Sequence, residues 1–157
     1  MTNMRRGFTM IELIFVIVII GILAAVAIPK LAATRSDATA AGCVHEAGQL
    51  VSEITARYTK VGYTAFKELG IAKITNITVG TTKGSGISST KLIKVDTAGI
   101  DYMCDGANIL NIKGGIEGND YNLSLTWTDG TTPASRVAAA KIKTNMLQGE
   151  TFKRVQL

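Results

Sequence analysis

Apolar residues fill the start of the chain almost without interruption. The run from Phe8 to Ile28 contains 21 residues, of which only Glu12 is charged. As a helix it would be about 31 Å long, close to the roughly 30 Å hydrocarbon core of a bilayer. The pattern therefore predicts a helix that can span a membrane. Gly21 and Pro29 weaken this helix, and we expect a kink or local melting near Pro29, because proline lacks the N–H that a helix interior needs.

A second helical pattern follows and continues to about Lys60. Glu53 and Arg57 form an i, i+4 pair on its polar side, and Gly62 is placed to end it. Its apolar residues recur at spacings of three and four, which is typical of a helix with one buried face. They are Ala40, Cys43, Val44, Ala47, Leu50, Val51, Ile54, Tyr58 and Val61.

Beyond Gly62 the composition changes to Thr, Ser, Gly and Asn with short apolar alternations, which predicts turns and strands. In the clearest strand, Tyr121–Thr128, apolar and polar residues alternate strictly. Weaker patterns predict strands at Ile74–Thr82, Lys91–Val95 and Ile109–Lys113. Turns are expected around the glycines Gly84, Gly86, Gly114, Gly115 and Gly118.

The C-terminal part of the chain has a third helical signal. Thr132 with Pro133 could open a short helix that reaches Leu147 and ends at Gly149, before a last strand or tail at Phe152–Leu157. The predicted fold class is therefore α+β, with a long N-terminal helix packed on a small antiparallel β-sheet.

The formal net charge is +5, but Arg5 and Arg6 lie before the apolar run, so the remainder is only mildly basic. Cys43 and Cys104 are the only cysteines, and they permit one intramolecular disulfide that an exported domain would retain. The alternative is two separate buried thiols, because free cysteine packs as a small hydrophobe. Spacing alone leaves both arrangements open.

The sequence contains no recognisable catalytic motif. His45 is the only histidine, and there is no nucleophile elbow, P-loop or dinucleotide fingerprint, so we expect no enzyme and no cofactor. Aromatic residues are not interleaved with the lysines as a stacking platform for single-stranded nucleic acid requires, so nucleic-acid binding is not expected.

Glu12 is the unusual residue of the apolar run. An acidic side chain at bilayer depth costs on the order of 3 kcal/mol, so this carboxylate needs a partner or a function. The alternative is that it lies at the level of the lipid headgroups.

Residues 5–13, RRGFTMIEL, resemble the cleavage site of the type IV pilin superfamily, which includes type IV pilins and the pseudopilins of type II secretion and competence systems. The shared features are a short basic leader that ends in Gly7, a phenylalanine at the first mature position (Phe8), a glutamate at the fifth (Glu12), the apolar run and Pro29. The resemblance covers about the first 35 residues closely and implies a pilin-like fold.

The resemblance also implies a processing step and an assembly contact. A prepilin peptidase would cut between Gly7 and Phe8 and methylate the new amine. In a filament, Glu12 of one subunit would then neutralise the amine of Phe8 of another. The implied partners are further copies or other pilin-like subunits, the peptidase, the membrane and an inner-membrane assembly platform. A competing interpretation is a signal peptide cut after the A-x-A pattern Ala25–Ala27, which would leave Ile28 at the new terminus.

Together these features predict four segments: a cytoplasmic leader (1–7), a transmembrane and assembly helix (8–28), an amphipathic helix that continues it (29–62) and an extracytoplasmic β-rich head (63–157). The expected location is the bacterial inner membrane, with a single pass, and then a periplasmic or cell-surface filament.

Two finer points depend on the branch of the superfamily. Many type IV pilins close a disulfide loop near the C-terminus, which Cys43 and Cys104 do not match, so a pseudopilin or minor pilin of a secretion or DNA-uptake machine is favoured. The alternatives are the main subunit of a pilus used for adhesion or motility, and a monomeric membrane-anchored binding protein.

The resemblance to some pseudopilins also makes calcium a candidate ligand, although turn chemistry alone explains the residues concerned: Asp96, Asp101, Asp105, Asn108, Glu117, Asn119 and Asp120.

Overall fold

The computed structural model describes residues 8–80, 99–117, 120–148 and 152–156. The chain forms two compact units, Met1–Arg35 and Ser36–Leu157. The second unit therefore includes most of the segment 29–62 that the sequence pattern set apart from the head.

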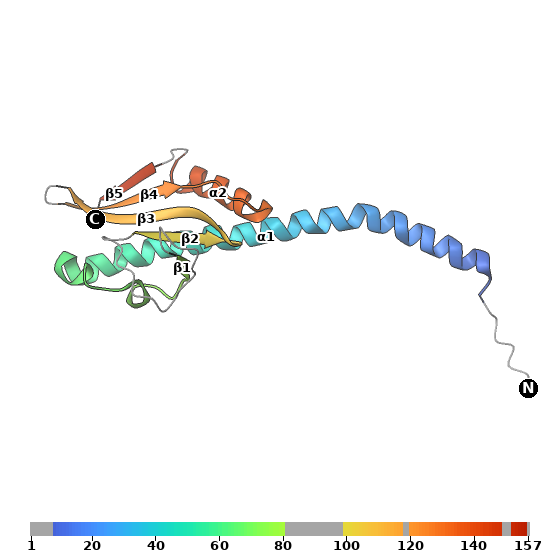
Figure 1. Ribbon diagram of the computed structural model, residues 1–157, viewed down its shortest axis with the longest axis horizontal. Coiled ribbons are helices and arrows are strands. Elements are labelled where there is room, and N and C mark those ends of the chain that lie inside the picture. The colour runs from blue at the N-terminus through green and yellow to red at the C-terminus, as the bar shows by residue number, and fades with distance from the viewer. Residues whose placement is uncertain (1–7, 81–98, 118–119, 149–151, 157) are drawn as a thin grey trace, which may run out of the picture. The chain divides into compact units, whose positions relative to one another are not determined.

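Helix α1 begins at Met10 and ends at Phe66 (Figure 1). Within this fully described helix, Gly62 is the one residue with non-helical backbone angles, at φ 71° and ψ 167°. A positive φ is readily adopted by glycine, so Gly62 interrupts the helix but does not end it as predicted, because a further helical turn follows and reaches Phe66. Gly21 and Pro29 keep helical angles in this single chain. Melting near Pro29 on assembly stays a prediction.

Five strands in the described part of the chain form one antiparallel sheet in the order β1-β2-β3-β4-β5 (Figure 1). Their bounds are Val79–Gly80, Ile100–Cys104, Ala107–Glu117, Asp120–Trp127 and Phe152–Gln156. Each strand pairs with its sequence neighbour, so the sheet is a simple meander.

The strand predictions had mixed outcomes. β4, β3 and β5 confirm the strands expected from Tyr121, Ile109 and Phe152. Within the predicted strand Ile74–Thr82, the described residues form a strand only at Val79–Gly80, which is β1. A short 3-10 helix, Ile71–Lys73, precedes it. The predicted strand at Lys91–Val95 lies outside the described residues, as do the turns at Gly84, Gly86 and Gly118. β2 was not predicted.

Helix α2, Pro133–Asn145, confirms the predicted C-terminal helix. Thr132 is its N-cap: the Thr132 Oγ1 accepts from the Ser135 N–H at 3.2 Å, and the Ser135 Oγ accepts from the Thr132 N–H at 2.9 Å. The two residues form a capping box with proline at the first helical turn. The helix ends two residues earlier than Leu147, and Gly149 lies outside the described residues.

The core of the second unit lies between the sheet and the two helices. Its α1 residues are those of the predicted three-and-four spacing, which confirms that this half of the helix has one buried face. α2 contributes Ala138, Ala139 and Ile142, and the sheet contributes residues of β1 to β4, which alternate along β2 and β4. The buried α1 side chains are Ala40, Cys43, Ala47, Leu50, Ile54 and Phe66.

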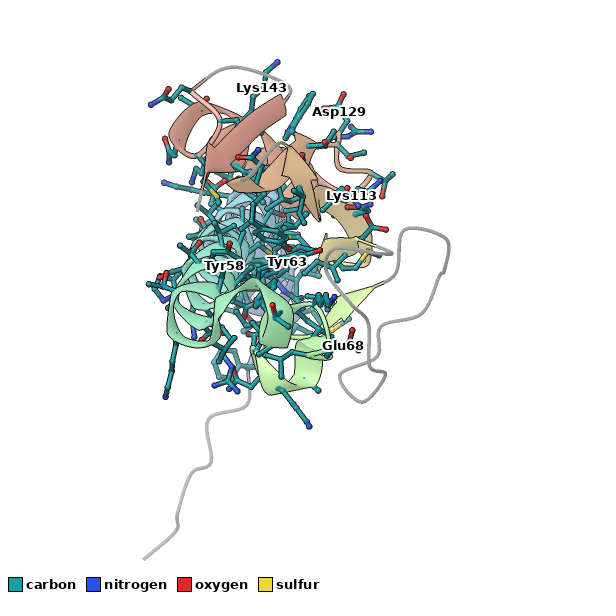
Figure 2. All side chains as sticks on the ribbon, turned by 90° about the vertical axis from the view of Figure 1, so that its left-hand side faces the viewer. Tyr58, Tyr63, Glu68, Lys113, Asp129 and Lys143 are labelled. Carbon is teal, nitrogen blue, oxygen red and sulfur yellow. A yellow bond between two sulfur atoms is a disulfide. The ribbon has the colours of Figure 1, made fainter. Side chains whose placement is uncertain are left out.

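An aromatic cluster lies near the end of α1, where Figure 2 labels Tyr58 and Tyr63. Tyr58 stacks on Tyr121 of β4 with ring centroids 4.7 Å apart, and Phe66 meets Tyr121 edge-on at 5.6 Å. Because Gly62 redirects the chain, Tyr63 also reaches Tyr121, at 5.6 Å. Tyr121 of β4 thus contacts the helix on both sides of the break at Gly62.

Gly114 and Gly115 lie inside β3, so the turn predicted there was wrong. The reason at Gly114 is steric: a Cβ atom would collide with the ring and hydroxyl of Tyr121, whereas a Cβ at Gly115 would meet nothing within 4 Å. Gly114 is a glycine because an aromatic ring occupies the space of its side chain.

Gly114→Ala is therefore expected to destabilise the second unit by roughly 1–3 kcal/mol, since the rigid Tyr121 ring must move to admit the methyl group. Gly115→Ala, one residue along the same strand, should be close to neutral. Urea unfolding of the detergent-solubilised chain, followed by the fluorescence of Trp127, the single tryptophan, measures both. Equal midpoints for the two variants would contradict this account of Gly114.

Candidate processing and assembly site

The N-terminal segment is exposed along nearly its whole described length. Phe8 is 84% exposed, and no residue in the described range 8–35 is buried. α1 contains a stretch that is long and apolar enough to cross a membrane. Large apolar side chains on every side of a helix require lipid or other helices around them, because water does not stabilise such a surface. The exposed apolar residues of α1 are Met10, Ile11, Leu13, Ile14, Phe15, Val16, Ile17, Val18, Ile19, Ile20, Ile22, Leu23, Val26, Ile28 and Leu31.

Glu12 has a partner one turn before it. The Glu12 Oε2 accepts from the Thr9 N–H at 2.8 Å and from the Thr9 hydroxyl at 2.7 Å. In return, the Glu12 N–H donates to the Thr9 Oγ1 at 3.3 Å. This is the reciprocal geometry of a capping box at the start of α1. The sequence contains the signal of this cap, Thr-x-x-Glu before an apolar run, although the cap was not predicted.

The other residues proposed for this segment are placed as follows. Phe8 immediately precedes Thr9 and is exposed, whereas Gly7 lies outside the described residues. Gly21 and Pro29 are exposed residues within α1. A chain that begins at Phe8 would therefore have its free amine one residue from the Thr9–Glu12 cap.

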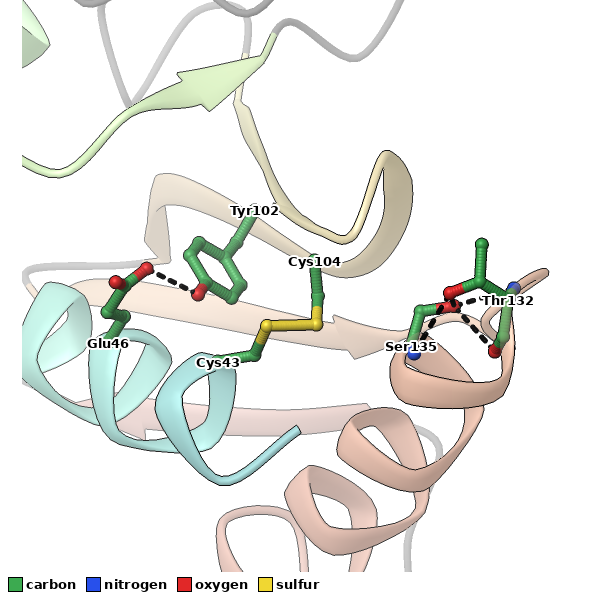
Figure 3. The surroundings of a disulfide bond; sticks show 6 residues. All are labelled: Cys43, Glu46, Tyr102, Cys104, Thr132 and Ser135. Carbon is green, nitrogen blue, oxygen red and sulfur yellow. Dashed lines mark hydrogen bonds between the residues drawn. A yellow bond between two sulfur atoms is a disulfide. The ribbon is translucent and has the colours of Figure 1, made fainter. Parts of the chain in front are cut away.

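In the second unit, Cys43 of α1 and Cys104 of β2 form a disulfide, with Cα atoms 5.7 Å apart (Figure 3). The alternative prediction, two separate buried thiols, was therefore wrong. One turn further along α1, the Glu46 carboxylate accepts a hydrogen bond of 2.8 Å from the Tyr102 hydroxyl. Burial raises the pKa of Tyr102, and the Glu46 carboxylate raises it further, so the phenol stays protonated and donates. Both contacts fasten the helix to the second strand.

Of the residues considered for calcium, Asp101 and Asp105 lie in different surroundings. Asp101 is buried in β2, where its Oδ1 accepts from the Asn111 side chain at 2.7 Å, while Asp105 occupies the turn after β2. Asp96 and Asn119 lie outside the described residues. Within the described ranges no group of three or more His, Cys, Asp or Glu side chains is placed to hold a metal. His45 is exposed on α1.

Comparison with known families gives one match. The model of the prokaryotic N-terminal methylation motif matches residues 2–28, which contain the basic leader, Gly7, Phe8, Glu12 and the apolar run. No solved structure matches the chain. The matched motif, the long N-terminal helix and the small antiparallel sheet agree with one another, and the fold is α+β and pilin-like. Residues 2–28 thus form a prepilin-type N-terminal methylation motif, which supports a type IV pilin-like protein.

Proposed function

We propose that this protein is a structural subunit of a helical extracytoplasmic filament and that it is not an enzyme. The observation that carries the proposal is the exposed apolar half of α1 with a single carboxylate, Glu12, at its start. A membrane alone would accommodate the apolar side chains but would disfavour the carboxylate. A bundle of identical helices accommodates both, provided that a positive group lies opposite Glu12.

That positive group is the amine produced by processing. A prepilin peptidase cuts between Gly7 and Phe8 and methylates Phe8, and the ammonium group of one subunit pairs with Glu12 of the next. A paired charge in a low-dielectric bundle costs far less than a lone one. Displacement by one residue would leave both charges buried and unpaired, so the contact also sets the register of assembly.

The disulfide supports the proposed topology. Disulfides persist in oxidising compartments and are rare in the cytosol, so a head held by Cys43–Cys104 suits the extracytoplasmic side. Arg5 and Arg6 suit the cytoplasmic side by the positive-inside rule. The chain would then cross the inner membrane once, and extraction into a filament would follow through contacts with an assembly platform.

Among filament systems we favour a pseudopilin or minor pilin of a type II secretion or DNA-uptake machine. The disulfide joins α1 to β2 and encloses no C-terminal loop of the kind found in many main pilus subunits. The main subunit of an adhesive or motile pilus is the second candidate. A monomeric membrane-anchored binding protein is the third, and it would share the apolar helix but need no neighbour for Glu12.

Processing before the apolar segment is expected to leave a mature chain that begins at Phe8 and carries one methyl group on its amine. Intact-mass and N-terminal peptide analysis of the protein from membranes and sheared fractions measures this. Gly7→Val should block the cut, because a branched side chain does not fit where glycine lets the backbone lie extended. A mature terminus at Ile28 would instead support the signal-peptide interpretation and overturn the proposal.

A further inference from the structure

We propose that Thr9 is a positioning residue for the assembly contact, which is an inference that rests on the proposed function. The capping box holds one carboxylate oxygen of Glu12, and the other oxygen is presented to the amine of Phe8 from the neighbouring subunit.

The division between the two oxygens comes from the hydrogen bonds. Both bonds from Thr9, from its N–H and from its hydroxyl, end on Oε2 of Glu12. The described residues provide no hydrogen-bond partner for Oε1, and the side chain is exposed. A carboxylate has about four lone-pair sites, so Oε1 can accept a charged donor while Oε2 stays in the cap.

Holding the carboxylate favours association for an entropic reason. A glutamate side chain has several rotatable bonds, and a contact that must first order them is weakened by the lost rotamer freedom. In this chain the hydrogen bonds from Thr9 order the Glu12 side chain before a neighbouring subunit binds. The cap also satisfies the Thr9 N–H and hydroxyl, which matters in lipid because no water is present to satisfy them.

The hydroxyl has two roles, which explains why this position needs threonine or serine. It donates to Oε2, and it accepts from the Glu12 N–H at 3.3 Å. Valine has nearly the same shape as threonine but can do neither, whereas serine can do both. The pair Thr9→Val and Thr9→Ser therefore separates the hydrogen bonds from the side-chain volume.

The first measurement is filament yield in sheared fractions, divided by the amount of chain processed at Phe8. Thr9→Val is expected to lower this ratio about tenfold or more, the scale of a lost hydrogen bond to a charged group. Thr9→Ser should stay within about twofold of the unsubstituted chain. Thr34→Val is the matched control, because Thr34 is in the same helix and its hydroxyl donates to the Lys30 carbonyl at 3.0 Å. A normal ratio for Thr9→Val would overturn the proposal while leaving the filament function in place.

The second measurement needs no filament. In detergent micelles, exchange of the Thr9 amide hydrogen with solvent should be several-fold faster in Thr9→Val and Glu12→Val than in the unsubstituted chain, and unchanged in Thr9→Ser. Unchanged exchange in Thr9→Val would overturn the positioning role even if this variant were not processed. If the unsubstituted chain forms no filaments, the proposed function fails, and the exchange rates still decide whether Thr9 holds Glu12.

Discussion

Glu12→Val is expected to abolish filaments while processing and membrane insertion continue. The two effects of the substitution have opposite signs. Valine lowers the cost of inserting the segment by about 3 kcal/mol, so a monomeric anchor would be unaffected or slightly helped. In a filament the same change leaves the amine of Phe8 buried without a counter-charge, a loss of roughly 3–5 kcal/mol. Because the loss recurs at each added subunit, growth should stop.

The measurement compares filaments in sheared fractions with processed subunit in the membrane. Photo-crosslinkers placed between residues 10 and 30 should give ladders of oligomers for the unsubstituted chain and little beyond monomer for Glu12→Val. Asp37→Val is the control, since it removes an exposed carboxylate from the same helix outside the apolar run. Filaments at the normal level from Glu12→Val would contradict the pairing role and favour the monomeric anchor.

Removal of the disulfide is expected to destabilise the second unit by about 4 kcal/mol. The bond closes a loop with a sequence separation of 61 residues, and the chain-entropy model assigns this magnitude to a loop of such length. That is a large fraction of the free energy of unfolding of a small domain. Cys43→Ala with Cys104→Ala removes both sulfur atoms from a buried site and leaves no free thiol that could form intermolecular bonds.

Urea unfolding of the detergent-solubilised chain, read by Trp127 fluorescence, should show a much lower midpoint for the double variant. A thiol reductant should shift the oxidised chain in the same direction and leave the double variant unchanged, which is the internal control. If the reductant has no effect on the unsubstituted chain once free thiols are detected, the disulfide does not stabilise the head.

The features that the sequence by itself determined are local ones. The membrane-length helix follows from an unbroken apolar run, and the one-sided burial of its second half follows from spacings of three and four. The break at Gly62 and the start of α2 at Thr132 and Pro133 depend on backbone angles and caps within a single turn. The cap of Glu12 by Thr9 belongs to the same class, because its pattern lies within four residues, although it was recognised only from the hydrogen bonds.

The tertiary structure decided everything that depends on residues far apart in the chain. Sequence spacing could not tell whether Cys43 and Cys104 meet, because their distance is set by how α1 lies on β2. β2 was not predicted, since its five residues gain their burial from β3 and the helices. Gly114 looks like a turn residue until Tyr121, contributed by the next strand, is seen to occupy its side-chain space. Local patterns encode helices, caps and breaks, whereas strand burial, glycine packing and disulfide pairing arise only when the folded chain brings distant residues together.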